Sequence, residues 1–187
     1  MRIGLIADTH MPGSIADLWP QVFESFQQVD CILHAGDLHT LDIVDELTAL
    51  APTYVSRGNG DRGLDDERLQ DNWQLEFHGV SIGMIHHFPS PARKSSEDIF
   101  RYVDKHFENR PNVLIYGHTH LEGIHHVEDM LCINPGSPTL PRNQSLRLGT
   151  IGMLEITPDY LESTIYQLGP DGTEIHESVK WEVDHVL

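Results

Sequence analysis

The sequence predicts an α/β fold in which two packed, mixed β-sheets are flanked by helices. In the first part of the chain, short apolar strands alternate with segments of helical periodicity in the order βαβαβ, which favours parallel strands joined by right-handed crossovers. Towards the end, closely spaced strands separated by turn residues are typical of an antiparallel meander. No repeat or linker interrupts the pattern, so we expect a single domain that spans residues 1–187.

In the first third of the chain, apolar runs of high β-propensity predict three strands. Between them, apolar residues recur every three or four positions, which is the period of an amphipathic helix. Pro20 is tolerable only in the first turn of its helix, and Ser14 or Asp17 could cap that helix. The expected elements are strands at residues 2–7, 30–34 and 53–56 and helices around residues 18–26 and 41–50.

The remaining chain predicts a hairpin, one helix and a series of further strands. His78 and Gly79 are expected to form the hairpin turn. Ser95 or Ser96, followed by acidic residues, is a good helix start. The expected strands cover residues 74–77, 80–85, 113–116, 123–127, 130–133, 150–156, 161–168 and 173–181, and the helix covers residues 99–107.

The charge balance limits the kinds of partner. The chain has 12 Lys and Arg residues against 29 Asp and Glu residues, a net charge of -17. A protein that clamps duplex nucleic acid normally needs a basic surface, so we expect no such partner. Small anionic substrates stay compatible with this composition, because bound cations can reverse the local field.

The cysteines and the apolar runs of the sequence indicate the cellular compartment in which the protein is expected. Cys31 and Cys132 both lie in apolar runs, so we expect buried free thiols, and a disulfide between them is the alternative. The N-terminal residues lack a signal-peptide layout, and no apolar run approaches the roughly 20 residues of a membrane span. We therefore expect a cytoplasmic protein with no membrane association. The apolar residues of the late strands either close the second sheet or form the edge of a homo-oligomer.

Metal-binding side chains follow several expected strands. The run VLIY leads through Gly117 to His118 and His120, and this spacing can send two imidazoles into one pocket. Taken alone they could be solvated loop histidines, but other expected strands also end at metal-binding residues. Ligands of α/β sheets gather at the carboxyl ends of strands, so these side chains can share one crevice. They are Asp8, His10, Asp37, Asn59, His86, His118 and His120.

The composition of this donor set favours two divalent ions. Two carboxylates, one amide and four imidazoles are too many donors for one tetrahedral ion. They suit two ions about 3.5–4 Å apart, with positions left open for water and substrate. Nitrogen and oxygen donors without thiolate favour Mn, Fe, Zn, Ni or Co.

Five short motifs occur in order along the chain. They are IADTH (residues 6–10), HAGD (34–37), RGNGD (57–61), the lone His86 after a strand, and GHTH (117–120). This ordered set resembles that of the calcineurin-like metallophosphoesterases, and NPGS (134–137) with Pro141 and Arg142 resembles the small YfcE-like phosphodiesterases within that superfamily. The resemblance covers nearly the whole chain. It implies a four-layer α/β/β/α sandwich and a metal-dependent phosphoric ester hydrolase.

The resemblance also assigns the donors to two ions that share both oxygens of Asp37. It implies that Asp37, Asn59 and His86 are catalytic and that a water or hydroxide bridging the ions attacks phosphorus. Manganese is favoured, and Ni, Zn, Fe, Co or Mg are alternatives. The implied ligand sets are Asp8, His10, Asp37 and His120 for one ion and Asp37, Asn59, His86 and His118 for the other.

Two positions depart from the family pattern. Many relatives have a histidine directly after the Asn of the GN motif, where it can protonate the leaving oxygen, but this chain has Gly60 there, as YfcE-like proteins often lack that histidine. His86 is followed by His87, where relatives more often have Gly. His39 and His87 are therefore candidate proton donors, with surface or supporting histidines as the alternative interpretation.

Further residues near the motifs could contact substrate or support the ligands. Arg57 and Arg142 are candidate phosphate contacts because a guanidinium suits a phosphate, although ordinary salt bridges are an equal alternative. Asp61 is expected to orient a ligand without binding the metal itself.

The leading functional hypothesis is a phosphodiesterase for a small phosphodiester or nucleotide-like substrate, with a phosphomonoesterase as an alternative. A catalytically silent protein-binding scaffold of the same fold, like the retromer subunit, is the alternative from another class. Such a scaffold needs no complete ligand set, whereas every ligand position here carries a competent donor. A histidine-rich storage protein is disfavoured, because its donors would cluster locally. A cyclic nucleotide, a nucleotide-derived diester and a glycerophosphodiester all stay open as substrates.

Overall fold

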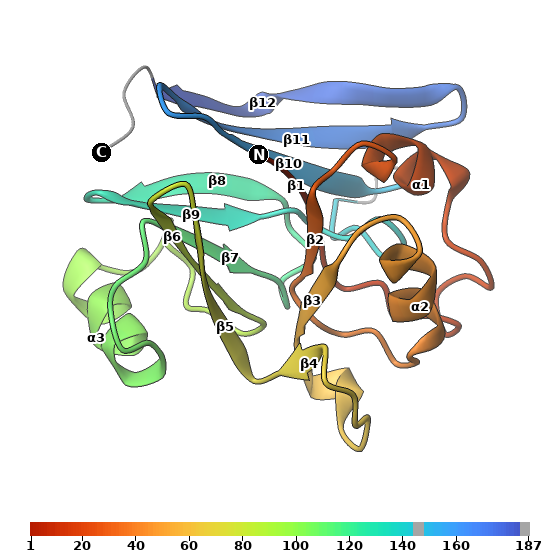
Figure 1. Cartoon of the computed structure of the whole chain (residues 1–187), viewed down its shortest axis with the longest axis horizontal. Helices are drawn as coiled ribbons and strands as arrows, with labels where there is room; N and C mark the ends of the chain where they lie inside the picture. Colours follow the sequence, from red (N-terminus) through yellow and green to blue (C-terminus); the bar gives the residue numbers. More distant parts are fainter. Residues whose placement is uncertain (144–147, 184–187) are drawn as a thin grey trace.

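Two β-sheets pack face to face in the computed structural model, which describes residues 1–143 and 148–183 (Figure 1). The larger sheet contains, in spatial order, β12 (Gly172–Val183), β11 (Leu161–Gly169), β10 (Thr150–Ile156), β1 (Arg2–Ile6), β2 (Cys31–His34), β3 (Thr53–Ser56) and β4 (Leu69–Gln70). The smaller sheet contains β5 (Asn72–Phe77), β6 (Val80–Ile85), β7 (Val113–Tyr116), β9 (Met130–Asn134) and β8 (Gly123–Val127).

Both sheets are mixed. Strands β1, β2 and β3 are parallel, as the βαβαβ order predicted, and β4 also pairs parallel with β3. Strand β10 pairs antiparallel with β1, and the antiparallel pairing continues through β11 to β12. In the smaller sheet β6, β7 and β9 are parallel, and β5 and β8 pair antiparallel at the two edges. The expectation of one late meander was wrong, because the β8–β9 hairpin joins the smaller sheet and only β10–β12 extend the larger one. Residue alternation within a strand does not indicate which sheet edge it will join.

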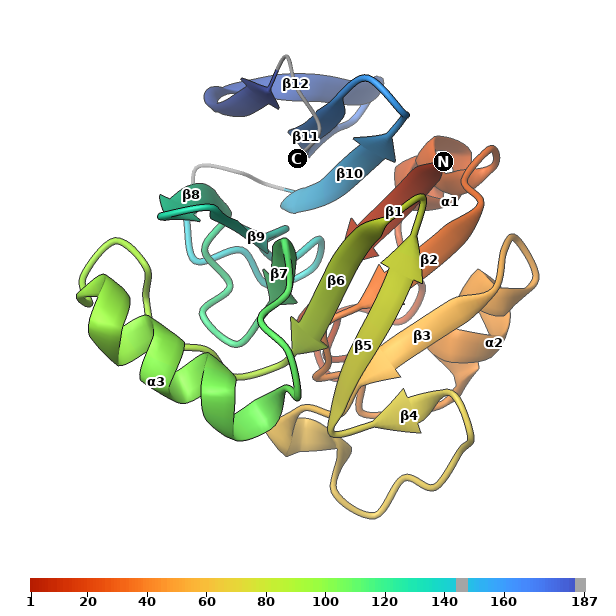
Figure 2. The ribbon, with the colours of Figure 1, turned by 60° about the vertical axis from the view of Figure 1, so that its left-hand side comes forward.

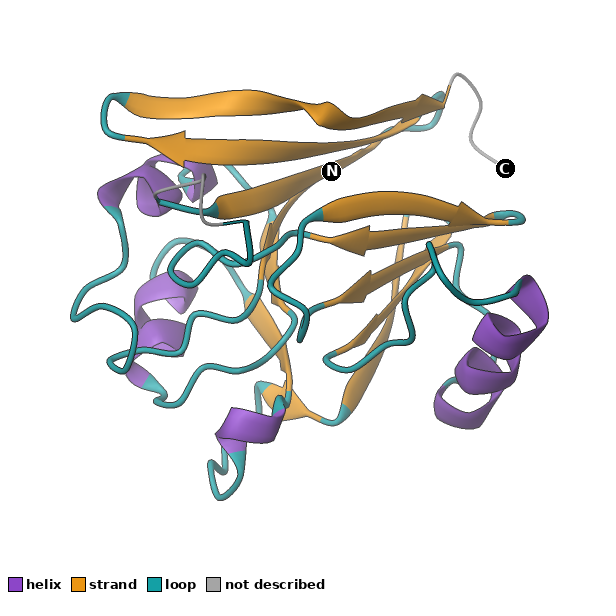
Figure 3. Ribbon diagram, turned by 180° about the vertical axis from the view of Figure 1, so that it is seen from behind, coloured by secondary structure: helices purple, strands orange, loops and turns teal. Residues whose placement is uncertain are grey.

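Helices cover the two outer faces (Figure 3). Helices α1 (Pro20–Phe26) and α2 (Asp42–Thr48) pack on the larger sheet, and α3 (Ser96–His106) packs on the smaller one. A further buried cluster lies between the sheets, with Leu5 and Leu33 from one sheet and Ile115 from the other. Because β1, β2 and β7 are covered on both faces, they are continuous apolar runs. The four-layer α/β/β/α architecture predicted from the sequence is confirmed.

Several local expectations can be compared with the structure. Ser95 caps α3 by accepting the Asp98 backbone N–H at 3.2 Å, as predicted. The His78–Gly79 hairpin turn is also confirmed, and both residues have positive φ, which a type I′ turn requires. The predicted side-chain cap of α1 was wrong. That helix begins after Trp19 without a side-chain cap, because Ser14 instead donates to the Thr9 carbonyl at 2.7 Å.

Two short elements were not expected. The 3₁₀ turn η1 (Asn59–Asp61) follows β3, and β4 adds a two-residue edge to the larger sheet. Such short segments are set by hydrogen bonds to distant backbone groups, which leave no periodic signal. The expected buried free thiols are confirmed for Cys31 and Cys132. No helix in residues 1–143 and 148–183 is long and apolar enough to cross a membrane.

Candidate metal centre

The ends of five strands bring the predicted metal donors together. Residues Asp8 and His10 follow β1, Asp37 follows β2, and Asn59 opens η1 after β3. His86 follows β6 directly, and the GHTH segment follows β7. The structure therefore places all of the predicted donors in one region, although they come from both sheets. Their carboxylate and imidazole ligand atoms form two groups, within each of which all atoms lie within 4.8 Å of one another: Asp8, His10 and His120, and Asp37, His86 and His118.

The first group is compact and largely buried. His10 Nε2 lies 3.1 Å from His120 Nε2, and His120 Nε2 lies 3.8 Å from Asp8 Oδ1. Asp8 is fully buried, and its Oδ1 accepts the His118 backbone N–H at 3.0 Å. Its other oxygen, Oδ2, is buried and has no hydrogen-bond partner. An orphaned carboxylate oxygen beside two imidazole nitrogens fits a bound cation.

The second group includes the predicted amide donor. His118 Nδ1 lies 3.3 Å from His86 Nε2, and Asn59 Oδ1 lies 3.1 Å from His118 Nδ1 and 3.3 Å from His86 Nε2. His86 is buried, whereas Asn59 and His118 are exposed. The second group is therefore open to solvent on one side, which leaves an approach for a substrate.

Asp37 lies between the two groups. Its Oδ2 is 3.4 Å from His10 Nε2 and 3.4 Å from His86 Nε2. Its Oδ1 accepts the Gly60 backbone N–H at 2.7 Å. Oδ2 is therefore the Asp37 oxygen that faces ring nitrogens of both groups, while Oδ1 also holds the η1 turn.

The far side of three imidazoles is held by a hydrogen-bond partner, which is a backbone carbonyl in two of them. His86 Nδ1 donates to the Ala35 carbonyl at 2.7 Å, and His120 Nδ1 donates to the Leu140 carbonyl at 2.7 Å. Since a carbonyl only accepts, Nε2 of both rings carries the lone pair that a metal needs. His10 Nδ1 lies 2.9 Å from His39 Nε2, which leaves His10 Nε2 facing the first group.

The ligand-bearing loops have an unusual backbone. Among the described residues, eight that are not glycine have positive φ, and five of these are predicted ligands: Asp8, His10, Asp37, His118 and His120. This left-handed region is costly for residues with a Cβ and clusters at functional sites. The sharp backbone reversal lets each loop return its side chain towards the strand end. Residue types alone carried no signal of this feature.

Asp61 organises the backbone around Asp37. Its carboxylate accepts the N–H groups of Asp37 and Gly58 at 2.8 Å each, of Leu38 at 2.6 Å and of His39 at 3.0 Å. The side chain is fully buried. As expected, Asp61 supports a ligand, and it does so through the ligand's backbone.

The NPGS segment supports the centre from the other side. Ser137 donates to the Asp8 carbonyl at 2.7 Å, and Asn134 Nδ2 donates to the Gly117 carbonyl at 3.1 Å and to Thr119 Oγ1 at 3.0 Å. The segment therefore ties the loop after β1 to the loop after β7. The contact between Ser137 and Asp8 joins segments 129 residues apart, so sequence reasoning missed it.

The pKa values of the donors are shifted in different directions, and at His86 burial is outweighed by the carboxylates of Asp37 and Asp8, which raise its pKa. Burial raises the pKa of Asp8 to about 6, although neighbouring imidazoles oppose the effect. Burial also acts on Asp37, but the protonated form of His86 and the Gly60 N–H outweigh it and hold the pKa of Asp37 below its usual range. Burial lowers the pKa of His10 and His118. Low imidazole pKa values favour the neutral form that binds metal ions.

The two candidate proton donors lie beside the ligands. A Cβ at Gly60 would come within 2.6 Å of His39 Nε2, so the His39 ring occupies the space next to this glycine. Because His39 also contacts His10, the geometry favours its alternative role as a supporting histidine. The His87 ring is exposed and lies 4.8 Å from the His118 ring.

The two candidate phosphate contacts lie in different environments. Arg57 forms an ion pair with Asp71 at 3.2 Å and donates to the Leu64 carbonyl at 3.3 Å. These contacts fit the alternative in which Arg57 forms an ordinary salt bridge and does not contact a phosphate. Arg142 is exposed, and its backbone N–H donates to the His120 carbonyl at 2.9 Å. Sequence reasoning missed Arg62 and Tyr102, which line a cleft beside Asn59 and His118.

Two packed sheets with Asp and His donors at their strand ends define the metallophosphoesterase class of fold. The chain belongs to the calcineurin-like phosphoesterase superfamily, whose domain model matches residues 1–159. It is 38% identical over 171 residues to a probable metallophosphoesterase from Methanothermobacter thermautotrophicus, covering 90% of this chain and 94% of that protein. It is 26% identical over 152 residues to the phosphodiesterase MJ0936 from Methanocaldococcus jannaschii, covering 73% and 83%. The family resemblance is confirmed, and the protein is a phosphoesterase-type hydrolase of a metal-dependent family.

Solved structures show the same fold at lower identity. Vacuolar Protein Sorting 29 from Cryptosporidium parvum matches with a TM-score of 0.78 and 16% identity, covering 98% of this chain and 97% of that one. At this identity the likeness establishes the architecture alone.

Proposed function

We propose that this chain is a phosphodiesterase that uses two divalent ions, with manganese favoured. The observation that carries the proposal is the position of Asp37 Oδ2, at 3.4 Å from a ring nitrogen in each donor group. A carboxylate oxygen shared by two donor groups suits a dinuclear centre. Ions bound there would neutralise charge on the phosphoryl oxygens and lower the pKa of a shared water.

The donor residues would hold the two ions in two groups. Asp8, His10 and His120 would form the more buried site, while Asn59, His86 and His118 would form a site that opens to solvent. Asp37 joins them. The substrate phosphate would approach from the open side, where the exposed Asn59 and His118 lie.

Two observations favour a diester over a monoester. A cleft of about 710 Å³ borders the open side and leaves room for a second ester group. A relative that matches 73% of the chain is named a phosphodiesterase. The lack of a side chain at Gly60 is compatible with a diester that has a good leaving group, since the histidine that protonates the leaving oxygen in many relatives is missing.

The proposal is tested by hydrolysis of a chromogenic phosphodiester and the matching monoester. The protein is stripped with a chelator and then given Mn²⁺, Ni²⁺, Zn²⁺ or Mg²⁺ singly. We expect restored hydrolysis of the diester at several times the rate of the monoester, and no hydrolysis by Asp37→Ala.

Faster monoester hydrolysis would replace the proposal with a phosphomonoesterase. No hydrolysis with any metal, although two ions are bound, would favour the protein-binding scaffold. The cytoplasmic location and a homo-oligomeric state stay predictions from the sequence.

A further inference from the structure

A cleft of about 710 Å³ extends from the open donor group towards α3. Asn59, His86 and His118 form one end of it, so a phosphate held at the metal centre would lie at that end. Residues of α3 and of the η1 segment line the cleft, and both elements lie in the lower part of Figure 2. Its volume is typical of small-molecule sites of roughly 300–1,000 Å³ and leaves room for much more than the phosphate.

Three aromatic rings line the cleft in a row that leads away from the metal centre. The ring row consists of His87, Tyr102 and His106. The His87 centroid lies 4.8 Å from that of His118 and 6.3 Å from that of Tyr102, and Tyr102 stacks on His106 at 4.2 Å. The Tyr102 hydroxyl donates to the His87 carbonyl at 2.8 Å, which ties α3 to the end of β6. The row is therefore held in place before any ligand binds.

Guanidinium groups line the cleft on the η1 side. Arg57 is engaged by Asp71, which also lines the cleft, and by the Leu64 carbonyl. Arg62 is exposed and makes no ion pair within the described part of the chain. Two arginines at one cleft are notable in a chain with a net charge of -17. A guanidinium suits both stacking on a flat ring and hydrogen bonding to polar groups.

Flat rings beside an arginine are the chemistry that binds a nucleobase. Stacking on aromatic side chains contributes about 1–3 kcal/mol per base and tolerates every base, because each has a π face. A glycerol group has no flat face and would gain nothing from the ring row. The cleft therefore distinguishes between the substrate classes compatible with the metal centre.

We propose that this cleft binds the nucleoside part of a nucleotide phosphodiester, with the base against the ring row and Arg62 and the scissile phosphate at the metal centre. This inference rests on the proposed phosphodiesterase function, and it narrows the substrate to nucleotide-derived diesters. Tyr102 and Arg62 are then specificity residues that contact the base.

Binding of two product-like ligands tests the inference without relying on turnover. Adenosine 5′-monophosphate and glycerol 3-phosphate each carry one phosphate, but only the first carries a base. Calorimetry on the manganese-loaded protein is expected to give at least fivefold tighter binding of the adenosine ligand. Tyr102→Leu removes the flat ring, so its affinity for adenosine 5′-monophosphate is expected to fall by about 5- to 150-fold.

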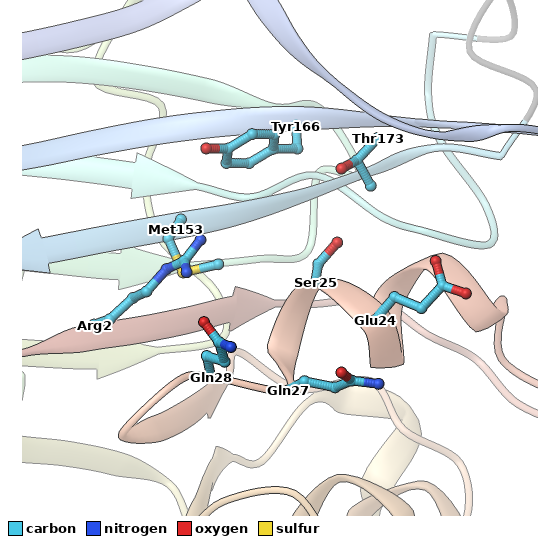
Figure 4. Close-up of a pocket in the computed structure, with 8 residues that line it drawn as sticks. All are labelled: Arg2, Glu24, Ser25, Gln27, Gln28, Met153, Tyr166 and Thr173. Atoms are coloured by element: carbon cyan, nitrogen blue, oxygen red, sulfur yellow. The ribbon is translucent and has the colours of Figure 1, made fainter.

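Three variants complete the test. Tyr102→Phe keeps the ring and is expected to keep the preference. Arg62→Gln should also weaken the binding of adenosine 5′-monophosphate without a similar effect on glycerol 3-phosphate. Because Arg62 is exposed, this variant keeps the test valid if Tyr102→Leu does not fold. Tyr166→Leu is the matched control, because Tyr166 is a half-buried tyrosine that lines a separate cavity of about 220 Å³ together with Arg2 and Met153 (Figure 4).

Equal binding of the two ligands by the wild-type protein would overturn the inference. An equal loss of affinity for both ligands in Tyr102→Leu and Arg62→Gln would also overturn the inference. Diester hydrolysis without a preference for the adenosine ligand would leave the phosphodiesterase proposal intact. A preference for the adenosine ligand without hydrolysis of any diester would instead overturn the phosphodiesterase proposal and support the nucleoside site.

Discussion

At the scale of single residues, several donors of the candidate metal centre are held by a second contact. The carbonyls of Ala35 and Leu140 fix the tautomers of His86 and His120. Such contacts orient the ring before a metal arrives and raise its basicity. The sequence predicted the donors from their residue types, but these second partners are backbone groups that any residue provides. Only the folded chain could reveal them.

The position of Asp37 predicts different metal losses for two substitutions. Asp37→Ala should disturb both ions, because its Oδ2 lies at 3.4 Å from a nitrogen of each group. Asn59→Ala should weaken mainly the ion of the open group, where its oxygen contacts His118 and His86. Metal analysis of the purified variants measures both effects. Two tightly bound ions in Asp37→Ala would show that the bridging assignment is wrong.

At the scale of elements, the loops after the strands determine the site geometry. The carboxylate of Asp61 in η1 accepts four backbone N–H groups, three of them from the loop after β2. The loops after β1 and β7 are joined by the NPGS segment. Strand positions could be predicted because apolar periodicity is local. The loop conformations could not, because they depend on hydrogen bonds between loops.

Two glycines have similar positive φ angles but different surroundings. Alanine substitutions at these positions can therefore distinguish the cost of a steric collision from the cost of the left-handed backbone. Gly36 has φ of +93°, and a Cβ there would collide with the Ser56 carbonyl oxygen and come within 2.8 Å of His86 Nδ1. Gly63 has φ of +90°, but a Cβ there would meet nothing within 4 Å. We expect Gly63→Ala to cost about 1–2 kcal/mol of unfolding free energy, which is the cost of the left-handed backbone.

Gly36→Ala should lower the free energy of unfolding clearly more than the matched control Gly63→Ala does. It should also lower the affinity for metal ions. Urea denaturation and metal titration of both variants measure these effects. Equal losses of stability in the two variants would show that the junction of β2 and β3 tolerates a side chain.

At the scale of the whole molecule, one buried histidine links stability to pH. His34 is fully buried, its Nδ1 accepts the Gly36 backbone N–H at 3.1 Å, and its Nε2 lies 3.1 Å from Thr9 Oγ1. Burial lowers the pKa of His34 to about 4. Between about pH 6.5 and pH 4 the unfolded chain binds a proton at this residue that the native state does not bind.

The free energy of unfolding should therefore fall as the pH falls through this window. The contribution of His34 is on the order of 3 kcal/mol and is fully present above about pH 6.5. Urea denaturation of the wild-type protein and His34→Gln at pH 7 and pH 4.5 measures it. Asp8 titrates in both proteins, so the difference between them reports His34. The same pH dependence in both proteins would contradict the assignment.

The sequence by itself determined the layers of the fold, the strands that carry the candidate site and the side chains that could hold a metal ion. These follow from local properties: the period of apolar residues, the turn residues between them, and side chains with metal-binding atoms at strand ends. The family motifs then indicated the chemistry. The glycine at position 60, where many relatives have a histidine, is also visible in the sequence alone.

The tertiary structure alone decided how distant segments meet. It placed the β8–β9 hairpin in the smaller sheet, the His39 ring beside Gly60, and the ring row and Arg62 in the lining of one cleft. Each of these depends on packing between segments far apart in the chain, which leaves no periodic or compositional trace. The donors can therefore be recognised in the sequence, but the cleft that we propose selects the substrate exists only once the two sheets and α3 have packed.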